Sequence, residues 1–142
     1  VFEENPLKRI SNDGIPEIAV EGKESLIKDL ILESNSHLQN VTVVKNDSLE
    51  DHAFYEFFGP GVGKEKGLRH ILDYLNLDWD SVAHIGDNYN DLEILKKVAL
   101  PIVMANGPLG VKKHASFVTV RDNNSGGVAE AIERILRTRG EL

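Results

Sequence analysis

The first part of the chain carries short apolar runs around one helical pattern. Residues 15–20 form an apolar-rich run, residues 41–44 are rich in β-branched side chains, and residues 53–58 are aromatic. These three runs predict strands, and the composition of residues 45–48 predicts a turn. Between the first two strands, apolar residues recur at helical spacing, namely Leu26, Ile27, Leu30 and Ile31. The pattern therefore predicts a small α/β unit that ends near Phe58.

A glycine-rich segment separates this unit from the rest of the chain. Residues 59–63 contain three glycines and one proline, a composition that favours a turn or hinge over a regular element. We therefore place a domain boundary here, with domains at residues 1–58 and 59–142.

After the glycines, strands and helices alternate. Apolar runs predict strands at residues 82–85, 101–104 and 117–120, and a short helix is expected at residues 109–114. Three further helices each have one apolar face, formed by Leu68, Ile71, Leu72 and Leu75, by Leu92, Leu95 and Val98, and by Val128, Ile132, Ile135 and Leu136. Such alternation with short connections predicts an α/β fold with a parallel sheet built from βαβ units.

Composition narrows the classes of function. With 23 acidic and 16 basic residues the net charge is −7, which argues against a nucleic acid or an anionic membrane as partner, because such binding relies on lysine and arginine. Cysteine is absent, so disulfides, thiol nucleophiles and cysteine-ligated zinc are excluded. No apolar run approaches the roughly 18 residues that a membrane span needs. We expect a cytoplasmic protein.

The segment Gly86-Asp87-Asn88-Tyr89-Asn90-Asp91 is the strongest candidate for chemistry. It follows a predicted strand, so Asp87 would lie at the carboxyl end of a parallel sheet, where open α/β folds bind ligands. Asp91 falls one turn later on the same side, and carboxylate and amide oxygens suit Mg²⁺. Helix capping explains the same residues equally well, since Asp and Asn are preferred at helix starts.

The surrounding motifs resemble those of haloacid dehalogenase (HAD) superfamily phosphatases of the Cof-type, or IIB, branch. Gly61-Val62-Gly63-Lys64 is similar to the lysine motif of that branch, and residues 85–92 match its Gly-Asp-x-x-Asn-Asp motif in full. Residues 102–107, 111–119 and 127–129 follow in the family's order. The resemblance implies a partial Rossmann-like parallel sheet, the C-terminal half of the HAD core, preceded by the C-terminal part of a small α/β cap.

The resemblance also implies roles for individual residues. Lys64 would act in catalysis by neutralising the substrate phosphate, Asn90 would contact that phosphate, and Asp87 and Asp91 would bind Mg²⁺, with Asp87 essential for catalysis. Asn106 is a weaker candidate, because an Asn before Gly-Pro is typical of a turn. One departure is Glu65, which stands where the family usually has glycine.

The nucleophile of the family is missing from this sequence. Its reaction begins with an Asp-x-Asp-Gly-Thr motif after a strand, and the only Asp-x-Asp here, at residues 78–80, lacks a preceding apolar run and is typical of a turn. The chain also opens on Val1 without an initiator Met. We therefore expect a piece of a longer Mg²⁺-dependent phosphatase for small phosphorylated metabolites such as a sugar phosphate or phosphoglycolate, inactive by itself.

Two other functions stay open. The chain could be a non-catalytic module that binds phosphate or a protein partner, which predicts a soluble, monodisperse protein. It could also be a phosphoacceptor of the response-regulator kind, although the acidic pair expected on its first strand is missing. As partners we expect the phosphorylated metabolite and either the missing N-terminal half or a second copy at an exposed sheet edge.

Overall fold

The computed structural model describes residues 14, 16–49 and 52–142 and divides the chain into two compact units. The first is Val1–Val62 and the second is Gly63–Leu142. The division falls within the glycine-rich segment 59–63, where Gly61 and Gly63 have φ values of 76° and 140°. These backbone conformations are accessible mainly to glycine.

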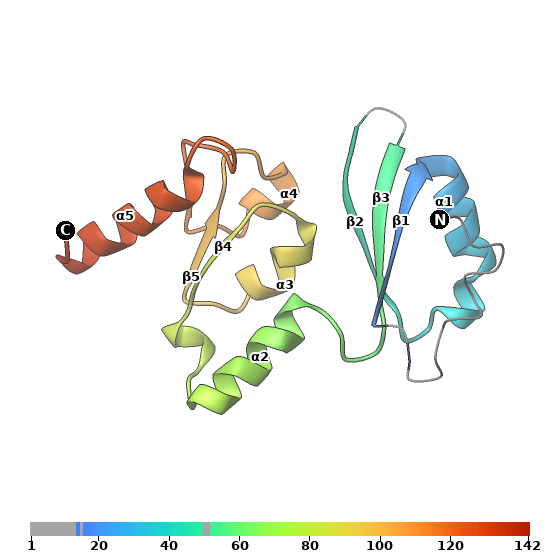
Figure 1. Cartoon of the computed structure of the whole chain (residues 1–142), viewed down its shortest axis with the longest axis horizontal. Helices are drawn as coiled ribbons and strands as arrows, with labels where there is room; N and C mark the ends of the chain where they lie inside the picture. The colour runs from blue at the N-terminus through green and yellow to red at the C-terminus, as the bar shows by residue number, and fades with distance from the viewer. Residues whose placement is uncertain (1–13, 15, 50–51) are drawn as a thin grey trace, which may run out of the picture. The chain divides into compact units, whose positions relative to one another are not determined.

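The first unit is a three-stranded antiparallel sheet with one helix (Figure 1). Its strands are β1 (Glu17–Lys23), β2 (Thr42–Leu49) and β3 (His52–Phe58), in the order β1-β3-β2. The helix α1 (Glu24–Glu33) follows β1 directly, and the 3-10 turn η2 (Asn35–His37) follows α1. The predicted helix is confirmed, whereas Ile15, the start of the first predicted strand, lies outside the described residues.

The core of this unit lies between α1 and one face of the sheet. Ile27 of α1 packs with Ala53 and Tyr55, which alternate along β3 and so face the same side. At the start of α1, Glu24 Oε1 lies 2.8 Å from Lys28 Nζ and 2.9 Å from Lys45 Nζ. Hydrogen bonds from Lys28 and then Lys45 lower the pKa of Glu24 to about 2.

The turn predicted at residues 45–48 is wrong, because β2 continues to Leu49. Two of the polar side chains that suggested a turn, those of Lys45 and Asn46, have partners on other elements instead. Lys45 donates to Glu24 of α1, and Asn46 donates to Glu56 on the neighbouring strand β3. Tertiary partners thus override a local preference for a turn.

The second unit is a parallel sheet of three strands, β4 (Ala83–Gly86), β5 (Leu100–Val103) and β6 (Phe117–Val118), in that order. Helices precede, connect and follow the strands, which confirms the predicted α/β class (Figure 1). These helices and 3-10 turns are α2 (Lys64–Leu75), η3 (Trp79–Ser81), η4 (Tyr89–Asp91), α3 (Leu92–Leu95), α4 (Leu109–Lys112) and α5 (Gly127–Arg139).

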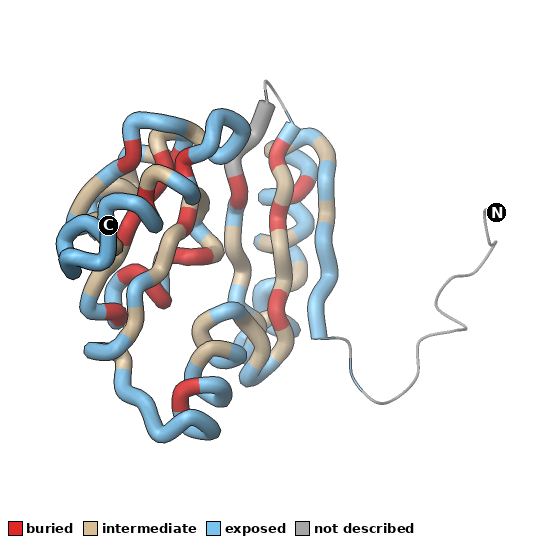
Figure 2. Tube along the Cα trace, turned by 60° about the vertical axis from the view of Figure 1, so that its left-hand side comes forward, coloured by how far each residue is buried: buried red, intermediate tan, exposed pale blue. Residues whose placement is uncertain are grey.

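The core of the second unit is centred on β5, which is flanked by a strand on each side. Ile102 and Val103 are fully buried, and Val103 packs with Leu95 of α3 and Val111 of α4. Figure 2 colours the buried parts of the chain red. Gly86 pairs with Val103, and Val103 with Val118, so the three strands end in register. The residues that follow the strands are therefore brought to one edge of the sheet.

Several boundaries differ from the prediction. The third strand covers only two of the residues 117–120, because the backbone N–H groups of Val120 and Arg121 donate to the Glu130 carboxylate of α5, at 2.8 and 2.9 Å. The Thr119 hydroxyl accepts from Ala105 N–H at 3.0 Å and donates to Arg121 O at 2.6 Å. On α2, Leu72 is buried, but Ile71 and Leu75 of the predicted apolar face remain about half exposed. Within the part of the chain that the structure describes, no helix is both long and apolar enough to cross a bilayer.

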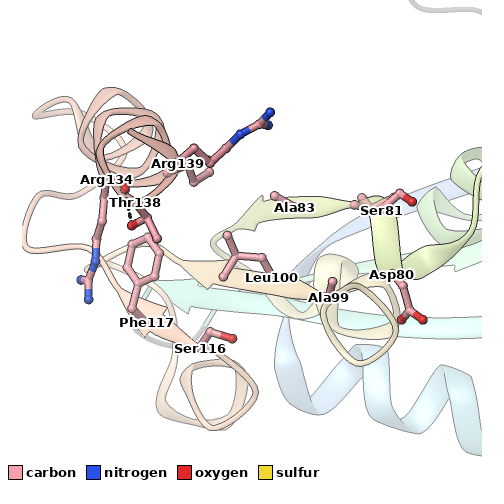
Figure 3. A pocket seen from close by; sticks show the side chains of 12 residues that line it. Asp80, Ser81, Ala83, Ala99, Leu100, Ser116, Phe117, Arg134, Thr138 and Arg139 are labelled. Atoms are coloured by element: carbon pink, nitrogen blue, oxygen red, sulfur yellow. Dashed lines mark hydrogen bonds between the residues drawn. The ribbon is translucent and has the colours of Figure 1, made fainter. Parts of the chain in front are cut away.

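A hollow of about 470 Å³ lies at the amino ends of the parallel strands (Figure 3). Ala83 of β4, Leu100 of β5 and Phe117 of β6 line it, together with α5. Arg134 of α5 lies over the Phe117 ring at 4.1 Å. The hollow is at the opposite end of the strands from Asp87, so it is distinct from the candidate site.

Candidate functional site

The candidate site lies at the carboxyl edge of the parallel sheet. Asp87 directly follows β4, Asn90 and Asp91 belong to η4, and Lys64 is the first residue of α2. The sequence predicted these four residues, and the structure brings them together. Asn106, which follows β5, also reaches the site.

Asp91 is the centre of the site, and its carboxylate is 5% exposed. Oδ1 lies 2.8 Å from Lys64 Nζ and 3.4 Å from His84 Nε2, while Oδ2 accepts from the Asp87 backbone N–H at 3.1 Å. Burial by itself would raise the pKa of Asp91, but hydrogen bonds from His84 and Lys64 and the charge of Lys64 outweigh it. The pKa therefore lies well below its ordinary range, and the carboxylate is ionised at neutral pH.

Lys64 links the start of α2 to η4. Its ammonium donates to Asp91 Oδ1 at 2.8 Å and to Asn90 Oδ1 at 3.2 Å, while half of its side chain stays exposed. A compact cation held in this way remains open to an incoming anion such as a phosphate.

Asp87 points to a different set of partners. Its Oδ2 accepts from Asn106 Nδ2 at 3.1 Å and from Asn123 Nδ2 at 3.3 Å. Asn123 N–H in turn donates to Asn106 Oδ1 at 3.0 Å, so the two amides support each other. No residue in the described ranges hydrogen-bonds to Asp87 Oδ1, which leaves this oxygen for a ligand.

Helix capping accounts for part of this segment. Asn88 is the cap of η4, because its Oδ1 accepts from Tyr89 N–H at 2.8 Å, and Asp91 Oδ2 completes a capping box at the Asn88 backbone N–H. Asp87 takes no part in this cap. The capping interpretation thus holds for Asn88 and partly for Asp91, but not for Asp87.

Gly86 sets how closely η4 approaches the strand. A Cβ on Gly86 would lie 2.7 Å from Asp91 Cβ and 2.9 Å from Asp91 Oδ2. Glycine at this position therefore allows the Asp91 carboxylate to lie against the end of β4.

Mg²⁺ fits Asp87 better than Asp91. The ion prefers carboxylate oxygens and retains several waters, and Asp87 Oδ1 offers one such oxygen, whereas both oxygens of Asp91 are bonded to the protein. The ranges 16–49 and 52–142 contain no group of three His, Cys, Asp or Glu residues that could hold a metal. The oxygen donors that these ranges offer to the ion are therefore a partial set.

Two site residues were not predicted from the sequence. Asn123 belongs to a polar loop after β6, and the parallel order of the strands was the available signal, because it places that loop at the same edge as Asp87. His84 lies in β4, two residues before Gly86, and its Nε2 is 3.4 Å from Asp91 Oδ1. Asp80, part of the only Asp-x-Asp sequence, lines the hollow at the other end of the sheet.

Comparison with known proteins identifies the family. A model of the haloacid dehalogenase-like hydrolase family matches residues 1–132. The chain belongs to the haloacid dehalogenase-like hydrolases. The predicted resemblance to this family is thereby confirmed.

The chain is also similar to individual proteins, which do not all carry the same name. The chain is 35% identical over 72 residues to a phosphoglycolate phosphatase of Methanosarcina acetivorans, which covers 51% of this chain and 31% of that protein. It is 32% identical over 114 residues to the chloroplastic endoribonuclease YBEY of Arabidopsis thaliana, covering 80% of this chain and 18% of that protein. A haloacid dehalogenase-like hydrolase structure from Bacteroides thetaiotaomicron matches at 30% identity and a TM-score of 0.72, covering 94% of this chain and 48% of that one.

Each of these matches covers only part of the relative's own length. The chain spans between 18% and 33% of the length of the first curated relatives that it matches. The activity of a whole relative therefore does not pass directly to this chain.

Proposed function

We propose that this chain supplies the phosphate- and cation-binding half of a Cof-type, Mg²⁺-dependent phosphomonoesterase that acts on a small phosphorylated metabolite. The observation that carries the proposal is the exposed Lys64 ammonium, held by Asp91 and Asn90 beside Asp87. A phosphoglycolate phosphatase among the relatives supports this class of substrate. Sugar phosphates belong to the same chemical class.

Each residue has a task in this proposal. Lys64 neutralises the phosphate and the charge that develops on it, and Asp91 holds the ammonium in place. Asn90 orients the ammonium through Oδ1 and presents its side-chain N–H groups to the phosphate. Asp87 offers Oδ1 to the ion, while Asn106 and Asn123 fix the orientation of its carboxylate. Bound Mg²⁺ supplies further charge neutralisation at the phosphate.

The nucleophile belongs to a segment that this sequence does not contain. In the complete enzyme an aspartate would attack phosphorus and form an aspartyl-phosphate. Among the described residues β4 pairs only with β5, so its other edge can accept a further strand. We propose the N-terminal half of the enzyme as the partner at this edge, with a second copy of the chain as the alternative.

Ligand binding tests the proposal without requiring turnover. The full chain is titrated with Mg²⁺ and with inorganic phosphate while amide NMR shifts are followed at Asp87 and Lys64. We expect Asp87→Asn to abolish the Mg²⁺ response and Lys64→Ala to abolish the phosphate response. Asp73→Asn is the control, because Asp73 makes an exposed pair with Arg69 on α2 and lies outside the site.

Turnover gives a second test. The chain alone should not hydrolyse p-nitrophenyl phosphate. A Mg²⁺-dependent rate that Asp87→Ala removes would show that these residues suffice for catalysis, and it would refute the assignment of the nucleophile to another segment.

The non-catalytic alternative makes a different prediction. A chain that evolved as a binding module should be monodisperse in sedimentation, because it would need no partner at β4. Concentration-dependent association, reduced by a proline in β4, supports the incomplete sheet instead.

A further inference from the structure

The residue after Lys64 is an acid whose side chain avoids the site. A carboxylate facing the Lys64 ammonium would compete with a bound phosphate. Glu65 instead places Oε1 at 2.6 Å from Lys97 Nζ, and its side chain is 13% exposed. A weaker contact, at 3.4 Å, joins its Oε2 to Lys66 Nζ.

Lys97 is held from two sides. It lies in the connection between α3 and β5, and its ammonium is 5.5 Å from the centre of the Trp79 ring. Trp79 is itself fixed to this connection, since its carbonyl accepts from the Ala99 N–H at 3.1 Å. A carboxylate and an aromatic face together localise the Lys97 cation.

Lys64 and Glu65 therefore attach the first turn of α2 to both ends of one segment. Lys64 reaches Asp91 at the start of α3, and Glu65 reaches Lys97 just after its end. The cap residue of α2 is Gly63, which has no side chain with which to cap the helix. Among the described residues, the hydrogen bonds and ion pairs of Lys64 and Glu65 are the polar side-chain contacts that join this turn to the segment 90–97.

We propose that Glu65 is a positioning residue, whose pair with Lys97 holds the first turn of α2 on the segment 91–97 and keeps the Lys64 ammonium at Asp91 and Asn90. The same pair directs the Glu65 carboxylate away from the phosphate. This second effect rests on the proposed function, whereas the positioning of Lys64 does not.

The two partners differ in what their removal leaves behind. Glu65→Gln removes both the ion pair with Lys97 and the negative charge beside Lys64. Lys97→Ala removes the ion pair but leaves the Glu65 carboxylate charged, with the longer contact to Lys66 in place of the close one to Lys97. The carboxylate can then turn toward the Lys64 ammonium and repel a phosphate. Lys97→Ala should therefore weaken phosphate binding more than Glu65→Gln, and adding Glu65→Gln to Lys97→Ala should recover part of the loss.

Side-chain NMR of the Lys64 ammonium tests the positioning directly in the full chain. We expect both single variants to lower the ¹⁵Nζ order parameter of Lys64 and to speed its proton exchange. Lys96→Ala is the matched control, because Lys96 pairs with Glu93 on α3 at 2.7 Å and touches no residue of α2 through that pair. Unchanged Lys64 signals in both Glu65→Gln and Lys97→Ala would overturn the proposal.

Titration with inorganic phosphate tests whether the pair with Lys97 directs the Glu65 carboxylate away from a bound phosphate. Glu65→Gln should weaken binding about twofold to fivefold, the range for an ion pair near the protein surface, because Lys97 is 42% exposed although Glu65 is only 13% exposed. Lys97→Ala should weaken binding further. Equal losses of phosphate affinity in the two single variants, or no recovery of affinity in the double variant, would show that Lys97 does not keep the Glu65 carboxylate away from the phosphate. If the wild-type chain binds no phosphate, the proposed function fails, and the Lys64 signals alone decide the positioning.

Discussion

The substitution Gly86→Ala tests whether the close approach of Asp91 to β4 builds the site. The new Cβ would lie 2.7 Å from Asp91 Cβ and 2.9 Å from Asp91 Cγ. Carbon atoms pack best at about 3.5 Å or more, so η4 would have to move by roughly 0.8 Å. Overpacking of this kind costs about 1–3 kcal/mol, and a displaced Asp91 also loses hydrogen bonds to a charged group, worth about 1.5–3 kcal/mol each. We expect a loss of at least about 2 kcal/mol.

Urea unfolding followed by Trp79 fluorescence measures this loss in the second unit, because Trp79 is the only tryptophan in the sequence. Gly67→Ala is the control: its Cβ would meet nothing within 4 Å, and alanine should stabilise the interior of α2 by about 0.5–1 kcal/mol. Amide shifts of Asp87 should change in Gly86→Ala and not in the control. Wild-type stability together with unchanged Asp87 shifts would refute the proposed packing.

Three further predictions follow from single contacts. Thr119→Val should destabilise the second unit by about 1–3 kcal/mol, because it leaves the Ala105 N–H without its acceptor; Trp79 fluorescence in urea measures this, and no change would contradict it. Since the pKa of Glu24 is lowered to about 2, its ion pairs stabilise the protein fully above the unfolded pKa of about 4.3 and progressively less as the pH falls toward 2; carboxyl ¹³C titration should show this midpoint, and a midpoint near 4.3 would refute it. Asn123→Ala should weaken Mg²⁺ binding at Asp87 without affecting the phosphate response at Lys64, and equal losses at both would show a general disruption.

Local sequence patterns predicted the secondary structure best where packing and periodicity agree. The helical spacing around Ile27 and the apolar run before Asp87 both produced the expected elements. The sequence pattern predicted the wrong element where polar residues have partners far away in the chain. Residues 45–48 continue a strand because Lys45 and Asn46 bond to other elements, which no local window contains.

In the candidate site, too, some residues could be predicted from the sequence and others only from the fold. Motif spacing identified Asp87 and Asp91, since a strand followed by Gly-Asp directs an acid to the sheet edge, whereas Lys64 and Asn90 were identified by the resemblance to the family. It did not identify Asn123, which follows β6 and lies 36 positions from Asp87 in the chain. Only the parallel register of the strands brings that amide to the Asp87 carboxylate.

The sequence by itself thus determined the α/β class, the family resemblance and the residues of the Gly-Asp motif, because these depend on local periodicity and spacing. The tertiary structure decided which atoms of those residues are available. It commits both oxygens of Asp91 to the protein, leaves Asp87 Oδ1 without a hydrogen bond from any described residue, and directs Glu65 toward Lys97. The reason is physical: hydrogen bonds and ion pairs between segments far apart in the chain are set by how those segments pack, which no short stretch of sequence records.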